Sequence, residues 1–135
     1  PLPVQSTARR VLVTGASRGL GLEFVRQLLA RGDTVIAACR RPAEAGALGA
    51  LAAANPDRLQ VQPLELTDAG SRAALLQAIA ADWGAIDVLV NNAGVLASGE
   101  RFGQLDAAHF RAAFETNALA PLLLAEAATP LLAKG

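Results

Sequence analysis

Apolar residues gather in four short runs along the chain, and segments of a different pattern separate them. Residues 10–14 (RVLVT) and 34–39 (TVIAAC) are nearly uninterrupted apolar stretches, which are typical of strands buried on both faces. Residues 59–66 form a third candidate strand, weakened by Pro63 because proline cannot donate to a sheet ladder. Residues 86–90 (IDVLV) form the fourth. The pattern therefore predicts four short strands, of which the third is the least regular.

Each predicted strand is followed by a segment that reads as a helix, in most cases because its apolar residues recur at helical spacing. The predicted helices cover residues 19–31, 42–54 (interrupted at Gly46 and Gly49), 68 to Gly84, and 106 to nearly the end of the chain. Strand and helix alternate four times, which indicates parallel strands with helices on both faces. We therefore expect an α/β fold, a Rossmann-type doubly wound parallel sheet truncated after the fourth strand and the helix that follows it.

Composition narrows the class of protein. Hydrophobic residues make up 53% of the chain and charged residues 18%, which indicates a globular domain. Lys+Arg and Asp+Glu both number 12, so nothing favours a nucleic-acid partner, and no apolar run approaches the roughly 20 residues that span a bilayer. The single cysteine, Cys39, excludes an internal disulfide, and we expect it to be a buried thiol at a strand end rather than a reactive one. We expect a cytoplasmic protein without nucleic-acid, membrane or metal ligands.

A glycine-rich turn joins the first strand to the first helix. A phosphate needs backbone N–H groups aimed at it without side chains in the way, and a glycine turn at a helix N-terminus supplies both, together with the positive end of the helix dipole. The simpler interpretation is an ordinary strand–helix turn. Here three residues separate the first two glycines, Gly15 and Gly19, and one residue separates Gly19 from Gly21.

This spacing resembles the TGxxxGxG signature of the short-chain dehydrogenase/reductase family, with Thr14 as its first residue. Two further motifs agree with that family in order and position. Asn91 to Gly94 (NNAG) resembles the family motif after the fourth strand, and Asn117 in FETNALAP is similar to the asparagine of the family's Asn-Ser-Tyr-Lys catalytic set. The resemblance covers the chain from Arg10 onward and is nearest to the carbonyl-reductase-like branch. Residues 1–9 are then a lead-in, and residues 10–135 an incomplete NAD(P)-binding domain.

The resemblance implies a set of site residues. The implied cofactor-binding residues are Gly15, Ser17, Arg18, Gly19, Leu20, Gly21, Arg40, Arg41, Asp68, Asn91, Ala93 and Gly94, and the implied catalytic residue is Asn117. Asp68 matches an acid that bonds the adenine amino group, but it is also a natural N-cap for the helix it begins. Asn91 is implied to hold the fourth strand and the ribose side, although two asparagines and a glycine also make a turn.

Basic residues at the end of the second strand bear on the choice of cofactor. Proteins that prefer NAD usually place an acid there, which bonds the ribose hydroxyls. This chain has Arg40 and Arg41 instead, and Arg18 in the glycine turn. A guanidinium can pair with a 2′-phosphate, whereas solvated surface arginines are the alternative. We therefore expect NADP, with NAD the less favoured cofactor.

The family's reaction moves a hydride between the nicotinamide and a small carbonyl or alcohol substrate, using a tyrosine, a lysine and a serine. This chain has no tyrosine, and its one lysine, Lys134, has no YxxxK context. We therefore expect an NADP-dependent oxidoreductase whose Tyr/Lys/Ser portion is absent from this chain, so that the 135 residues alone are inactive. The alternatives are a non-catalytic nucleotide-binding or protein-interaction module of the same descent, and a fragment that does not fold stably. A homo-oligomer of the full-length protein stays open.

The last predicted helix carries a proline four residues after Asn117. Pro121 has no N–H, so the regular helical partner of the Asn117 carbonyl is missing, and we expect a kink there with water or a side chain on that carbonyl. In the family that the chain resembles, the asparagine lies at a helix bend and holds a water in the proton path.

Overall fold

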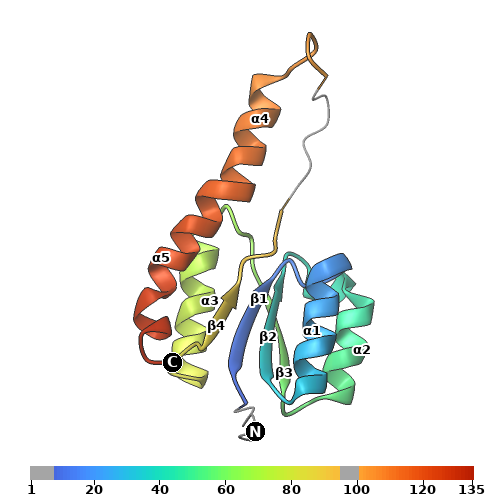
Figure 1. The fold of residues 1–135 in the computed structure, drawn as a ribbon, viewed down its shortest axis with the longest axis vertical. Coiled ribbons are helices and arrows are strands. Elements are labelled where there is room, and N and C mark those ends of the chain that lie inside the picture. The colour runs from blue at the N-terminus through green and yellow to red at the C-terminus, as the bar shows by residue number, and fades with distance from the viewer. Residues whose placement is uncertain (1–7, 95–100) are drawn as a thin grey trace, which may run out of the picture.

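The computed structural model describes residues 8–94 and 101–135 as a parallel sheet between two layers of helices (Figure 1). The elements in chain order are β1 (Arg10–Thr14), α1 (Gly19–Arg31), β2 (Thr34–Cys39), the 3-10 turn η1 (Pro42–Glu44), α2 (Gly46–Ala54), β3 (Leu59–Pro63), α3 (Ala69–Asp82), β4 (Val88–Val90), α4 (Ala107–Phe114), the π-helical turn η2 (Glu115–Leu119) and α5 (Ala120–Leu132). The strand order is β3-β2-β1-β4, and every pairing is parallel. The doubly wound Rossmann-type fold is therefore confirmed.

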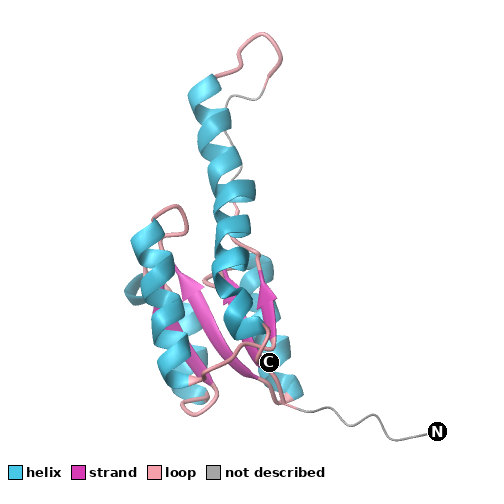
Figure 2. Cartoon of the chain, turned by 90° about the vertical axis from the view of Figure 1, so that its left-hand side faces the viewer, coloured by secondary structure: helices cyan, strands magenta, loops and turns pink. Residues whose placement is uncertain are grey.

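Both faces of the sheet are buried, as the apolar runs predict. On one face Leu12 and Ile36 pack with residues of α3 and α5, whereas on the other Val11 and Val13 pack with residues of α1 and α2. Successive side chains of a strand point to opposite faces, so a continuous apolar run supplies both layers at once. Figure 1 shows the strands with α3 and α5 on one side and α1 and α2 on the other, and Figure 2 looks toward the side of α3 and α5. The predicted bounds of β1, α1 and β2 match the structure residue for residue.

The predicted helix over residues 42–54 is divided differently in the structure. A 3-10 turn occupies Pro42–Glu44, the break falls at Ala45, and α2 then runs through Gly49 without interruption. A Cβ added at Gly49 would meet nothing within 4 Å among the described residues. A glycine inside a helix is about 1 kcal/mol less favourable than an alanine, and the alanines and leucines around Gly49 favour the helix enough to offset that cost. The expectation of an interruption at Gly49 was wrong.

Two strands are shorter than predicted. β3 ends at Pro63, and its last bond to β2 runs from the Leu64 N–H to the carbonyl of Cys39 (2.9 Å), the last residue of β2; Leu64 and Leu66 beyond β3 are still buried. β4 begins at Val88 rather than at residue 86, because the N–H of Ile86 donates to the Leu131 carbonyl of α5 (3.0 Å). The backbone at the start of the predicted fourth strand therefore bonds to α5 instead of to a neighbouring strand.

One ion pair ties the beginning of β1 to the segment before β4. The Asp87 carboxylate accepts from the backbone N–H of Arg10 (2.7 Å) and from its Nε (3.0 Å) and Nη2 (3.3 Å). The hydrogen bonds from the Arg10 side chain and backbone, in that order, hold the pKa of Asp87 below its usual value. The Asp87 carboxylate therefore links the first residue of β1 to the segment just before β4, 77 residues later in the sequence.

We expect Asp87→Asn to lower the stability of the protein in a pH-dependent way. A carboxyl whose pKa is lower in the folded state stabilises above its unfolded pKa of about 3.9, and that contribution is lost as pH falls through the folded pKa. The melting temperature should fall by at most about 5 °C near pH 7, because the pair is partly exposed. Thermal melts between pH 2 and pH 7 measure it. Asp57→Asn, an exposed acid with no ion pair among the described residues, is the control. A difference from wild type that persists undiminished at the lowest pH would contradict this account.

Candidate functional site

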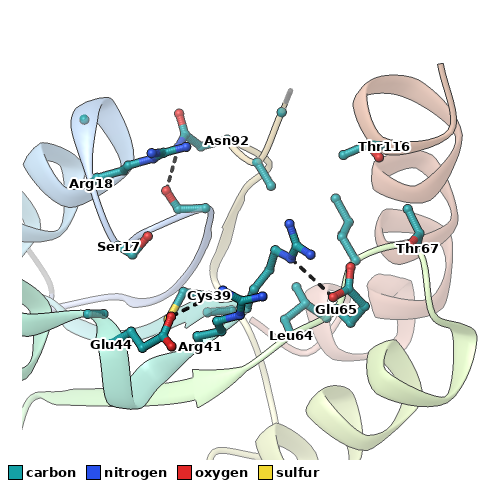
Figure 3. A pocket seen from close by; sticks show the side chains of 18 residues that line it. Ser17, Arg18, Cys39, Arg41, Glu44, Leu64, Glu65, Thr67, Asn92 and Thr116 are labelled. Atoms are coloured by element: carbon teal, nitrogen blue, oxygen red, sulfur yellow. Dashed lines mark hydrogen bonds and ion pairs between the residues drawn. The ribbon is translucent and has the colours of Figure 1, made fainter. Parts of the chain in front are cut away.

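A cavity of about 720 Å³ opens at the carboxyl ends of the strands, a usual size for a small-molecule site. It lies where the chain leaves β1 and β4 toward opposite faces of the sheet, which is where doubly wound folds bind ligands. Its lining comes from the turns after all four strands and from the π-helical turn (Figure 3). The lining residues are Gly15, Ser17, Arg18, Gly19, Ala38, Cys39, Arg40, Arg41, Glu44, Ala45, Leu64, Glu65, Leu66, Thr67, Asn92, Ala93, Gly94 and Thr116.

The glycine turn has the backbone that its sequence predicts. Gly15 and Gly19 have φ of +61° and +59°, the left-handed region that favours glycine. A Cβ at Gly15 would lie 2.7 Å from the Cα of Ala93, and one at Gly21 would collide with the Gly15 carbonyl oxygen. The side chain of Arg18, the N-cap residue of α1, makes no capping hydrogen bond, whereas Asp68 and Asp106 cap α3 and α4. The first N–H groups of α1 thus face the cavity end of the helix without a side-chain acceptor.

A buried threonine joins this turn to the turn after β4. Thr14 Oγ1 accepts from the backbone N–H groups of Asn92 (3.1 Å) and Ala93 (3.2 Å) and donates to the Val90 carbonyl (3.4 Å). The side-chain amide of Asn92 donates in turn to the Gly15 carbonyl (3.1 Å). These bonds fix the two walls of the cavity relative to each other.

The second asparagine of the NNAG motif, not the first, belongs to the cavity. Asn92 lines it, whereas Asn91 is exposed and donates to the Pro121 carbonyl at the start of α5 (3.3 Å). Adjacent residues at the end of a strand point to opposite sides, so only one of the two can face the cavity. The sequence motif alone does not single out Asn92, although the alternation of side chains along the strand is a usable signal. A ribose contact from Asn91 stays a prediction, because the side-chain amide of Asn91 bonds to α5 in the structure.

Asp68 also lies outside the cavity lining. Its carboxylate accepts from the N–H groups of Gly70 (2.8 Å) and Ser71 (3.3 Å), so it caps α3. The acid that lines the cavity after β3 is Glu65, with Thr67 beside it. The capping interpretation of Asp68 is therefore what the structure shows, and its adenine contact stays a prediction. The sequence contains two acids after β3, and spacing alone does not tell which one turns inward.

The three arginines of the predicted cofactor site border the same cavity. Arg18, Arg40 and Arg41 all line the cavity. Arg40 Nε lies 3.3 Å from Glu65 Oε2, and Arg41 Nη1 lies 3.4 Å from Glu44 Oε2. Arg18 makes no ion pair with any residue that the structure describes. The cavity lining therefore carries three arginines, of which Arg40 and Arg41 are each paired with a carboxylate.

Three other predicted residues lie next to the cavity rather than in its lining. Leu20 has a side chain that is 72% exposed, and Gly21 is buried behind the turn. Asn117 stands against the turn after β4, because its Oδ1 would be 3.3 Å from a Cβ at Gly94. Its neighbour Thr116 does line the cavity and was not predicted.

The helix that carries Asn117 is irregular where the proline predicts it. Residues Glu115–Leu119 form a π-helical turn, in which the N–H of Ala120 donates to the Glu115 carbonyl, five residues back. Pro121 has no N–H, and its ring crowds the preceding turn, which accounts for the widening. Figures 1 and 2 show α4 and α5 stacked in one column without a sharp bend. The expected irregularity is confirmed, but it is a widened turn rather than a kink.

Cys39 is a free, buried thiol, and His109 lies on α4. Burial raises the pKa of the Cys39 thiol, the larger effect, against a bond from the Arg41 backbone that lowers it, so the inert interpretation is supported. The His109 side chain is exposed, and its Nδ1 lies 3.8 Å from Oδ2 of Asp106. Within residues 8–94 and 101–135 no three His, Cys, Asp or Glu side chains gather as a metal site, and no helix there is long and apolar enough to cross a membrane.

Comparison with known proteins agrees with the fold. The family model described as short chain dehydrogenase matches residues 9–135. An uncharacterized oxidoreductase of Bacillus subtilis is 38% identical over 91% of this chain and 44% of its own length. NADPH-bound carbonyl reductase from chicken fatty liver superposes with a TM-score of 0.88 at 38% identity, covering 94% of this chain and 52% of that one. A Dichelobacter nodosus protein named "Probable NADP-dependent dehydrogenase" is 42% identical over 63% of this chain and 77% of its own.

The parallel sheet and the cavity at its carboxyl ends define a Rossmann-type protein. The chain belongs to the short-chain dehydrogenase family. It spans about half the length of the Bacillus and chicken relatives.

Proposed function

We propose that this protein is an NADP(H)-dependent oxidoreductase that moves a hydride between nicotinamide and a small carbonyl or alcohol. The observation that carries the proposal is the cavity that joins an uncapped helix N-terminus in a glycine turn to three arginines. The chicken relative binds NADPH and the Dichelobacter relative is named as NADP-dependent, which supports the same cofactor.

The glycine turn fits a pyrophosphate. Gly19 lines the cavity, and a Cβ there would meet no described atom within 4 Å, so the backbone borders open space. Phosphate oxygens next to it would accept from the free N–H groups at the start of α1 and would lie at the positive end of the helix dipole. Gly15, Gly19 and Gly21 are then required because side chains would fill that space or break the turn.

The arginine end fits a 2′-phosphate. A guanidinium offers a fixed fork of donors to phosphate oxygens, and Arg40 and Arg41 follow directly on β2, where an acid would favour unphosphorylated ribose. Arg18 approaches from the glycine turn on the other wall. We place the adenosine phosphate between these side chains.

Bound in this cavity, the dinucleotide would supply or accept the hydride at its nicotinamide ring. The residues of this chain position it. Thr14 and Asn92 keep the two cavity walls at a fixed separation, and Gly94 lets Asn117 approach the turn after β4. Asn117 is the residue of this chain that we assign to the catalytic set.

The full-length protein should oxidise NADPH in the presence of aldehydes or ketones. Gly15→Ala should abolish this activity, because φ of +61° disfavours a side chain and the Cβ would meet the Ala93 backbone. Gly49→Ala is the matched control and should stay active, because a Cβ at this position of α2 would meet no described atom within 4 Å. The loss of NADPH absorbance measures both. No turnover by the wild type with a broad carbonyl and alcohol panel would contradict the proposal.

Pro121→Ala tests the role of the π-helical turn. The substitution supplies an N–H four residues after Asn117 and removes the ring, so the turn should tighten to a regular α-helix and move the Asn117 side chain. We expect turnover of the full-length enzyme to fall by about tenfold or more, with the Kd for NADPH nearly unchanged. Steady-state kinetics and cofactor titration separate the two. Unchanged turnover would show that the widened turn has no catalytic role.

A further inference from the structure

Both arginines that follow β2 are paired with carboxylates inside the same cavity. Arg40 forms an ion pair with Glu65, which follows β3. Arg41 forms an ion pair with Glu44, which lies three residues later in the sequence, in η1. The two carboxylates lie on different sides of the arginines, Glu44 beside Arg41 and Glu65 toward Thr67 (Figure 3). All four side chains are exposed, with the carboxylates 68% and 49% accessible. The cations proposed for the 2′-phosphate are thus already neutralised in part.

We propose that Glu44 and Glu65 are specificity-determining residues that reduce the preference of this site for a 2′-phosphorylated dinucleotide. The inference rests on the proposed function and extends it. A 2′-phosphate placed between Arg40 and Arg41 carries nearly two negative charges and lies within a few ångströms of both carboxylates. NADH has a neutral hydroxyl at that position, so the carboxylates oppose NADPH and leave NADH nearly unaffected.

Two effects of the carboxylates oppose each other, and their sizes decide the sign. Each glutamate also holds its arginine in place, which would favour phosphate binding. Exposed ion pairs of this kind contribute little, since solvent screens them and the side chains stay mobile. The repulsion between a carboxylate and a doubly charged phosphate at a similar distance is larger and falls with ionic strength. Removing either carboxylate should therefore tighten NADPH binding.

The experiment measures Kd for NADPH and for NADH in the full-length protein and in Glu44→Gln, Glu65→Gln and the double variant. We expect the ratio Kd(NADH)/Kd(NADPH) to rise about two- to tenfold for each single variant. The double variant should exceed either single variant, and the effect should shrink in high salt. The ratio is used because Glu65 lines the cavity in which both cofactors are proposed to bind, so its removal can change both Kd values.

Glu23→Gln is the matched control. Glu23 is an exposed acid on α1 paired with Arg26 three residues away (3.5 Å), the same arrangement as Glu44 with Arg41, but it does not line the cavity. Its ratio should equal that of the wild type. A ratio that falls, stays constant, or changes equally in Glu23→Gln would overturn the inference. A wild type that binds the two cofactors equally contradicts the cofactor assignment alone, because the ratio in the glutamine variants still decides the role of Glu44 and Glu65.

Discussion

Arg40→Asp should weaken NADPH binding to the full-length protein by about 2 kcal/mol or more, on the order of 30-fold in Kd. The substitution removes a guanidinium from the cavity and adds a carboxylate next to Glu65, its present partner at 3.3 Å. A charge-assisted pair is lost and a repulsion is gained, and both act on the 2′-phosphate. NADH should bind as before or more tightly, because an acid after the second strand can accept from the ribose hydroxyls.

Calorimetric titration of both cofactors measures this effect. Arg26→Asp is the control, since Arg26 is an exposed arginine paired with Glu23 outside the cavity. Equal losses for NADPH and NADH would indicate damage to the whole cavity rather than to a phosphate site. An unchanged Kd for NADPH would remove Arg40 from the site.

Residues 1–135 alone should show no dehydrogenase activity, a loss of about 100- to 10,000-fold or more relative to the full-length enzyme. The chain contains no tyrosine to act as the acid/base of this family, and Lys134 follows α5 outside any YxxxK context. We propose that Asn117 and the cavity position the cofactor, but the amide of Asn117 does not act as an acid or base toward a carbonyl.

NADPH oxidation by the purified 135-residue chain, with circular dichroism to establish that it is folded, tests this prediction. The full-length protein at equal concentration provides the reference rate. Protein-dependent turnover by the short chain would show that another residue of this half supplies the proton, and Thr116 in the cavity lining would be the first to substitute.

The sequence predicts best those parts of the fold in which local pattern and tertiary packing agree. β1 and β2 are apolar runs that serve both faces of the sheet, and α1 begins in a glycine turn and ends at Gly32, which has φ of +101°. At β4 the agreement fails, because Ile86 is apolar enough for a strand but bonds to α5. A residue's hydrogen-bond partner in another element cannot be found from its own neighbourhood in sequence.

The site follows the same rule. The glycine turn and the arginines are fixed by local backbone and strand position, and the sequence places them in the cavity. Glu65 and Asn92 each have a residue of similar chemistry nearby in the sequence, Asp68 and Asn91 respectively. Which member of each pair faces the cavity depends on the course of the backbone in three dimensions. The π-helical turn was foreseeable as an irregularity at Pro121, but its form depends on how α5 packs.

The central claim is that this cavity binds NADP(H) in preference to NAD(H). Titration of the full-length wild-type protein with NADPH and NADH under identical conditions, at low and at physiological salt, tests it most directly. The account predicts tighter binding of NADPH by about tenfold or more, with the advantage shrinking as salt screens the arginines. NADH bound as tightly as NADPH at both salt concentrations would contradict it.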